Sequence, residues 1–240
     1  MDEESAKLAL LIRALDQPDK KAVREAVDAL IPMAKSAPEV AARLNAALEA
    51  APAEKRWPIA YVLAHVSPLS TPCVDALEDA LDISDPDIRW AVALLLVGLA
   101  KKPEPAVAAH LVDLLDSGSP TQRRMAIYCL RDIGAEDLLR VALQHALDDP
   151  DPLVRVAAVT SLKTFPKIGR EVADELLRFV SEDLDSRVRA SAALALAHVG
   201  APTERILRTL EDAIRSPDAK LAKAARAALS VLEQKGPGSS

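Results

Sequence analysis

Apolar positions recur along the chain at helical spacing, and the same pattern returns about every 33 residues. Aligning these segments places one residue type at a shared position, which we number zero. Position zero holds Arg24, Arg56, Arg89, Arg123, Arg155, Arg189 and, where the series departs from arginine, Ala222. The spacings between these residues are 32, 33, 34, 32, 34 and 33. The alignment therefore predicts seven repeats.

Three positions after the anchor are apolar in every repeat. Position three holds Val27, Ile59, Val92, Ala126, Ala158, Ala192 and Ala225. Position seven holds Ile31, Leu63, Leu96, Leu130, Leu162, Leu196 and Leu229, and position ten holds Ala34, Val66, Leu99, Ile133, Phe165, Val199 and Leu232. Steps of three and four residues bring side chains to one face of a helix. We therefore predict that these positions form the core.

Helix start signals precede this pattern by four residues. Asp85, Asp151, Asp185 and Asp218 stand there, and Ser119 with Pro120 takes the same place in the fourth repeat. Aspartate and serine are good N-caps, and proline is tolerated in the first helical turn. In the first two repeats Lys20 and Pro52 replace the aspartate.

A second helical pattern precedes each of these turns, as in "TPCVDALEDAL" and "PTERILRTLEDAI". Each repeat is therefore predicted to be a helical hairpin, and neither helix could bury its apolar face alone. We expect an all-α fold, an αα-superhelix of about seven hairpins and fourteen helices without a strand. This single solenoid domain would span residues 1–235, and the tail "GPGSS" at 236–240 would be flexible.

Composition agrees with a helical chain. Half of the residues are apolar, 28% are charged and only 2% are aromatic, which suits closely packed helices better than a β-sandwich. The most hydrophobic segment, "WAVALLLVGLA", lies between Arg89 and Lys101 and is too short to span a membrane. It is predicted to be a buried helix.

Three of the predicted second helices resemble those of a known family. The segments "SDPDIRWAVALLL", "DPDPLVRVAAVTSL" and "DLDSRVRASAALALAHVG" are similar to HEAT repeats, particularly the short variety of phycobilisome-lyase-like proteins. The resemblance covers about residues 3–234 and implies a right-handed superhelix whose second helices line the concave side. Such motifs specify a fold but not a function.

Charge and cysteine usage narrow the function classes. The net charge of −6 disfavours a basic nucleic-acid groove, and with it the DNA glycosylases that share this type of repeat. The start "MDEESAKLAL" is acidic where a secretory signal would be basic, so we expect a cytoplasmic protein. Cys73 and Cys129 fit no CxxC or zinc spacing and are predicted to be core residues.

The sequence contains none of the common catalytic or metal-binding motifs. None of the four histidines stands four residues from another or beside a glutamate, unlike the iron-binding pairs of HEAT-like deoxyhypusine hydroxylases. GxSxG, Walker A and GxGxxG are absent. The run "DDPDP" from Asp148 is explained by a capped turn, and the repeated arginine by ion pairs with turn aspartates of its own or the next repeat. We expect no catalytic residue, no metal and no cofactor.

The few aromatic residues provide the best candidate for a site. On a helix, positions one, five and eight point away from positions three, seven and ten. Position one holds Trp57 and Trp90, and position five holds Tyr61 and Tyr128, so both tryptophans and both tyrosines fall on this second face. Leu94 and Val97 lie on the same stripe, and Arg124 and Arg131 border it.

Two interpretations of this stripe are open. The rings could pack between neighbouring second helices, or they could form a binding surface, since Trp, Tyr and Arg dominate interaction hot spots. We favour a non-catalytic scaffold that is monomeric by itself and binds a peptide segment or helix of another protein along the concave groove. The alternative is an enzyme or ligand handler of the bilin-lyase kind, with a small flat ligand against Trp57 and Trp90.

Overall fold

The structure is a computed structural model of the chain, and it describes residues 3–66, 69–102, 106–199 and 203–235. The predicted flexible tail, residues 236–240, lies outside the described residues. The chain divides into two compact units, residues 1–109 and 110–240.

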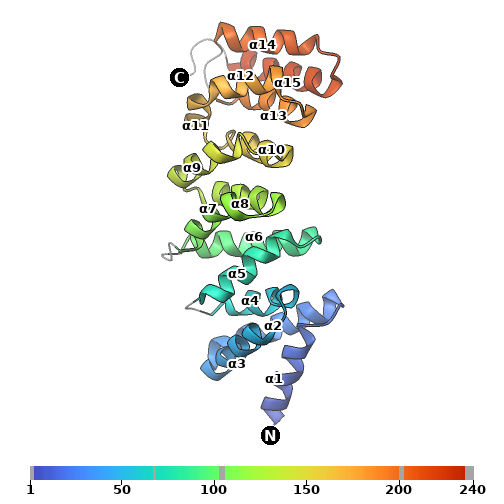
Figure 1. Cartoon of the computed structure of the whole chain (residues 1–240), viewed down its shortest axis with the longest axis vertical. Coiled ribbons are helices and arrows are strands. Elements are labelled where there is room, and N and C mark those ends of the chain that lie inside the picture. Colours follow the sequence, from blue (N-terminus) through green and yellow to red (C-terminus); the bar gives the residue numbers. More distant parts are fainter. Residues whose placement is uncertain (1–2, 67–68, 103–105, 200–202, 236–240) are drawn as a thin grey trace. The chain divides into compact units, whose positions relative to one another are not determined.

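The described part of the N-terminal unit is built from α-helices and two short 3₁₀ turns (Figure 1). Its helices are α1 (Glu3–Ala14), α2 (Lys20–Ser36), α3 (Pro38–Ala50), α4 (Trp57–Leu63), α5 (Thr71–Asp79) and α6 (Pro86–Ala100), with the 3₁₀ turns η1 (Ala53–Lys55) and η2 (Ala80–Asp82). Helix α2 packs against α4, and α4 packs against α3 and α5.

Helix α7 (Ala106–Ser117) crosses the boundary between the two units along the chain. The C-terminal unit continues with α8 (Pro120–Ile133), α9 (Glu136–Ala146), α10 (Pro152–Ser161), α11 (Pro166–Glu171), α12 (Ala173–Glu182), α13 (Ser186–Leu196), α14 (Glu204–Ile214) and α15 (Ala219–Lys235). The second helices of its hairpins stack in chain order, with α8 against α10, α10 against α13, and α13 against α15.

The all-α prediction is confirmed, because the described residues contain helices and connections but no strand (Figure 1). The expected number of fourteen helices is wrong by one: fifteen α-helices lie in the described part of the chain. The extra helix arises in the sixth repeat, where the first helix is broken at Val172 into α11 and α12. Gly169, a poor helix former just before the break, lets α11 approach Val199 closely, since a Cβ there would meet Val199 Cγ1 at 2.2 Å.

The predicted core positions are largely confirmed. Position three is buried in all seven repeats, and position seven is buried in the five central ones. Ile31 and Leu229, at position seven of the first and last repeats, are only half-buried, and Leu30 and Ala228 beside them are buried instead. Position ten is less regular, with Val66, Ile133 and Phe165 half-buried and the other four residues buried.

The predicted helix starts are confirmed. The carboxylates of Asp85, Asp151, Asp185 and Asp218 accept hydrogen bonds from backbone N–H groups of the first turn that follows, and Ser119 forms a reciprocal capping box with Gln122. In the first repeat the cap is Asp19 rather than a residue at the position of Lys20, because α2 begins one residue early relative to the alignment. Among the described helices, none combines the length and the hydrophobicity needed to cross a membrane.

Candidate functional site

The repeated arginine is engaged in structure in the C-terminal unit. Arg123 and Arg155 each donate from Nε and Nη2 to the two oxygens of one carboxylate in the next repeat, Asp149 and Asp183, at 2.7–2.9 Å. Their Nη1 groups donate to backbone carbonyls of their own turns. Arg189 forms a third such pair, with its Nη2 donating to the carboxylate of Asp218 at 2.6 Å. The predicted ion pairs with turn aspartates of the next repeat are confirmed for these three arginines, whose guanidinium groups are thus engaged within the fold.

The anchors of the N-terminal unit make different contacts. Arg56 donates to the carbonyl oxygen of Ala51, and Arg89 donates to that of Ile83, each at 2.9 Å and each within its own turn. The Nε of Arg89 is buried and has no hydrogen-bond partner among the described residues. These arginines brace the turn that precedes the second helix, so they too are committed to structure.

The first two candidate aromatics lie on α4, four residues apart. Helix α4 begins at Trp57, with Pro58 in its first turn, and its buried face is formed by Ile59, Val62 and neighbouring residues. Trp57 and Tyr61 are half-buried on the other side. The ring of Tyr61 lies against His65, with 5.3 Å between centroids.

The most exposed candidates lie on α6. Asp85 caps this helix, and from there the turns place Trp90 and Leu94 on one face, four residues apart. Trp90 is 43% exposed and Leu94 65% exposed. Val97, which was expected on the same stripe, is instead buried. Helical phase gives only the direction of a side chain from its own axis, and it does not reveal which positions other elements cover.

The remaining three candidates belong to α8, in the C-terminal unit. Arg124, Tyr128 and Arg131 are all half-buried. The guanidinium carbon of Arg131 lies 5.0 Å from the centre of the Tyr128 ring, and its Nε donates to the carboxylate of Asp132 at 2.7 Å. Thus all four aromatic rings of the stripe keep some surface in solvent. That the α4, α6 and α8 residues act as one site stays a prediction.

One polar contact near the exposed face of α6 was not predicted from the sequence. The ammonium of Lys20, at the start of α2, pairs with the carboxylate of Asp85 and lies 3.9 Å from that of Asp87. In the sequence, the only unusual feature of Lys20 is that it stands where later repeats have aspartate. Its partners lie two repeats away, and no local pattern predicts such a contact.

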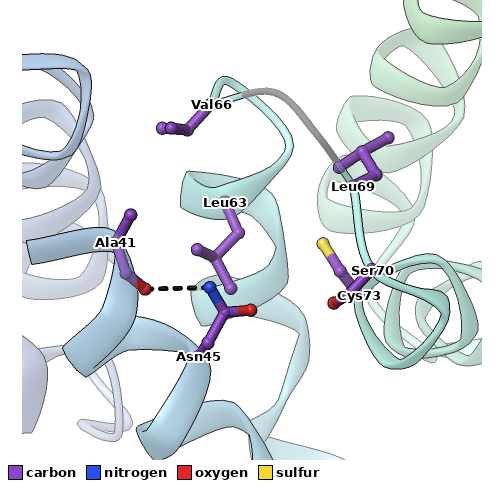
Figure 2. Close-up of a pocket in the computed structure, with 7 residues that line it drawn as sticks. All are labelled: Ala41, Asn45, Leu63, Val66, Leu69, Ser70 and Cys73. Carbon is purple, nitrogen blue, oxygen red and sulfur yellow. Dashed lines mark hydrogen bonds between the residues drawn. The ribbon is translucent and has the colours of Figure 1, made fainter. Parts of the chain in front are cut away.

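A cavity of about 240 Å³ lies elsewhere in the N-terminal unit (Figure 2). Its lining comes from α3, α4, α5 and the connection between the last two: Ala41, Asn45, Leu63, Val66, Leu69, Ser70 and Cys73. The Asn45 amide donates to the carbonyl of Ala41 at 2.9 Å. Typical ligand pockets hold roughly 300–1,000 Å³, so this cavity is small, and none of the four candidate aromatics lines it.

Both cysteines are buried free thiols, as expected. The Sγ of Cys73 donates to the Ala60 carbonyl at 3.3 Å. Burial raises the pKa of each thiol to about 12, which keeps both protonated and unreactive at neutral pH.

Comparison with known proteins identifies the repeat. A family model described as HEAT repeats matches residues 40–131, 74–163 and 139–230. The chain belongs to the HEAT-repeat family. The narrower resemblance to phycobilisome-lyase-like repeats stays a prediction. No curated protein sequence matches the chain.

Of three similar solved structures, one has a TM-score above 0.5 and agrees with the HEAT-repeat fold. Kap121p bound to Nup53p is similar with a TM-score of 0.64 and 13% identity over 94% of this chain, although the chain spans only 29% of the length of Kap121p. An engineered protein matches 96% of the chain and 98% of its own length at 20% identity, with a TM-score of 0.45. A designed armadillo-repeat protein in complex with the peptide (KR)4 matches 94% of the chain and 99% of its own length at 18% identity, with a TM-score of 0.34.

Proposed function

We propose that this HEAT-repeat protein is a non-catalytic scaffold that binds a segment of a partner protein on the exposed face of its second helices. The surface that we assign to this role is the α6 face formed by Trp90 and Leu94, extended by the half-buried rings of Trp57 and Tyr61 on α4. Arg124, Tyr128 and Arg131 on α8 are proposed as further contacts.

The exposure of Trp90 and Leu94 is the observation that carries the proposal. Five large apolar side chains are exposed in the described part of the chain, and two of them are these neighbours on α6. The other three, Leu10, Val141 and Leu184, lie on three different segments. Scattered apolar residues are ordinary on a protein surface, whereas tryptophan is enriched among interaction hot spots, and this one lies beside a second exposed apolar side chain.

The fold supports a protein as the partner. Kap121p, whose structure shares the fold at a TM-score of 0.64, is seen bound to Nup53p. A HEAT-repeat array presents successive second helices at regular intervals, which suits an elongated ligand better than a compact one. We further propose that residues 1–235 act as one solenoid domain and that the protein works as a cytoplasmic monomer.

A differential pull-down from the native source tests this function. The bait proteins would be the unmodified chain, Leu94→Ala and Leu10→Ala. Leu10 is the matched control, because it is a leucine of the same unit with the same 65% exposure as Leu94. A protein retained by the unmodified chain and by Leu10→Ala but lost with Leu94→Ala supports the proposal. Retention by all three baits would contradict the assignment of the surface.

The visible absorbance of the purified protein distinguishes the small-ligand alternative. A bilin-type chromophore held against the tryptophans brings visible bands, and a peptide brings none. Visible bands that disappear in Trp90→Ala would favour the ligand handler over the scaffold.

A further inference from the structure

Three exposed residues of α6 combine a charge, an aromatic ring and an aliphatic side chain. Asp87, Trp90 and Leu94 are spaced by three and four residues, so they follow one another along one helix face. The side chain of Asp87 is 91% exposed, and both apolar neighbours are exposed as well. This face therefore offers a carboxylate and an indole ring side by side, followed by an aliphatic surface.

The sequence around this face is strongly acidic. Between Arg56 and Arg89 the chain has no lysine or arginine, and it has six carboxylates: Asp75, Glu78, Asp79, Asp82, Asp85 and Asp87. Over residues 1–109 there are 12 basic and 17 acidic residues, and over 110–240 there are 18 and 19. The excess of negative charge is thus concentrated in the unit that carries the exposed α6 face.

The chain itself places an ammonium group at the start of this face. Lys20 pairs with Asp85 and lies 3.9 Å from Asp87 while it remains 63% exposed. The paired carboxylate holds the pKa of Lys20 above its ordinary value, and Lys20 in turn holds the pKa of Asp85 below its own. Asp85 is only 21% exposed and caps α6, whereas Asp87 is 91% exposed and its contact with Lys20 is long. Long, exposed contacts of this kind are weak, so an incoming cation can compete with Lys20 for Asp87.

We infer that the partner segment is cationic and amphipathic, with a Lys or Arg side chain against Asp87 and Trp90 and an apolar side chain against Leu94. This inference rests on the proposed scaffold function and names the chemistry of its partner. Both the carboxylate and the face of the indole ring attract a cation electrostatically. Tryptophan is the best aromatic partner for an ammonium or guanidinium group. An acidic segment would meet repulsion from Asp87 and its neighbours.

Binding of three synthetic peptides to the full chain tests the inference. The first is a short labelled peptide of alternating lysine and leucine pairs, and the other two replace every lysine with glutamine or glutamate. Fluorescence anisotropy at low salt should show binding in the order lysine, glutamine, glutamate. Trp90→Ala should weaken binding of both the lysine and the glutamine peptide.

Charge variants of the protein locate the effect. Asp87→Asn should weaken binding of the lysine peptide about fivefold and leave binding of the glutamine peptide unchanged. Lys20→Met should strengthen binding of the lysine peptide, because it removes the ammonium group that competes for the carboxylate. Asp174→Asn is the matched control for net charge, since Asp174 is an exposed carboxylate of the other unit, and it should change little.

The possible failures are distinguishable. Equal binding of all three peptides, each weakened by Trp90→Ala, would overturn the cationic partner and leave the scaffold function standing. Equal weakening by Asp87→Asn and Asp174→Asn would show unspecific charge attraction and also overturn the inference. Absence of binding by the lysine peptide would overturn it as well, and the pull-down with Leu94→Ala would then decide separately on the scaffold function.

Discussion

The Arg155 guanidinium donates from Nε and Nη2 to the two carboxylate oxygens of Asp183, and each donor–acceptor distance is 2.9 Å. The pair therefore joins two consecutive repeats. Both side chains are mostly buried, 15% and 5% exposed, and Asp183 also accepts the backbone N–H of Asp185. Such a pair stabilises the fold only while both members are present, because either charge alone would be buried without compensation.

Asp183→Ala should therefore lower the free energy of unfolding by about 3 kcal/mol or more. Asp174→Ala is the control, since its partner Arg205 and Asp174 itself are 67% and 77% exposed, and it should cost less than about 1 kcal/mol. Urea unfolding followed by circular dichroism measures both. Equal losses in the two variants would mean that the Arg155 pair is no stronger than a surface pair.

Leu130→Ala or Leu162→Ala should destabilise the protein by about 2–5 kcal/mol, because each side chain is fully buried and its removal leaves a cavity. Leu94→Ala, at 65% exposure, makes the same chemical change on the surface and should leave the unfolding midpoint nearly unchanged. If the midpoints of Leu130→Ala and Leu94→Ala coincide, position seven is not the core of the repeat.

The Arg189–Asp218 pair predicts a particular pH dependence. The hydrogen bond from Arg189 holds the pKa of the Asp218 carboxyl below its ordinary value. A lowered folded-state pKa contributes stability above the unfolded-state pKa of about 3.9, and this contribution is lost as the pH falls through the folded-state value. At pH 7 the unmodified protein should have a higher melting temperature than Asp218→Asn, and this difference should shrink as the pH is lowered. A difference that grows toward low pH would contradict the assigned pair.

The two buried thiols should be protected from reagents. Because burial raises the pKa of Cys73 and Cys129 to about 12, neither forms appreciable thiolate in the native protein at neutral pH. Titration with a thiol-specific chromogenic reagent should be slow until denaturant is added and then show two thiols. Rapid reaction of one thiol before unfolding would contradict the burial of that cysteine in the native protein.

Most of the fold could be predicted from the sequence, because periodicity and caps are local signals. Position three is buried in every repeat, and Asp85, Asp151, Asp185 and Asp218 cap the helices where the alignment places them. The break at Val172 was missed, because neither proline nor glycine stands at that residue to signal it. The close approach of Gly169 to Val199 joins residues 30 positions apart, and no local pattern predicts such a contact.

The candidate surface was predictable only in part. Phase analysis placed Trp90 and Leu94 on an exposed face, but it placed Val97 there too, and Val97 is buried. The pairing of Lys20 with Asp85 could not be predicted from the sequence, because it depends on how the first and third repeats fold against one another. Direction from a helix axis is encoded locally, whereas coverage by other elements and long-range ion pairs are not.

The most direct test of the account is the affinity of Trp90→Ala for a partner protein recovered in the differential pull-down, measured by calorimetric titration beside a thermal melt of the same variant. The account predicts that binding weakens about thirtyfold or more, as expected for a hot-spot tryptophan, while the melting temperature barely changes. A large drop in melting temperature with undiminished affinity would contradict it and would make Trp90 a packing residue.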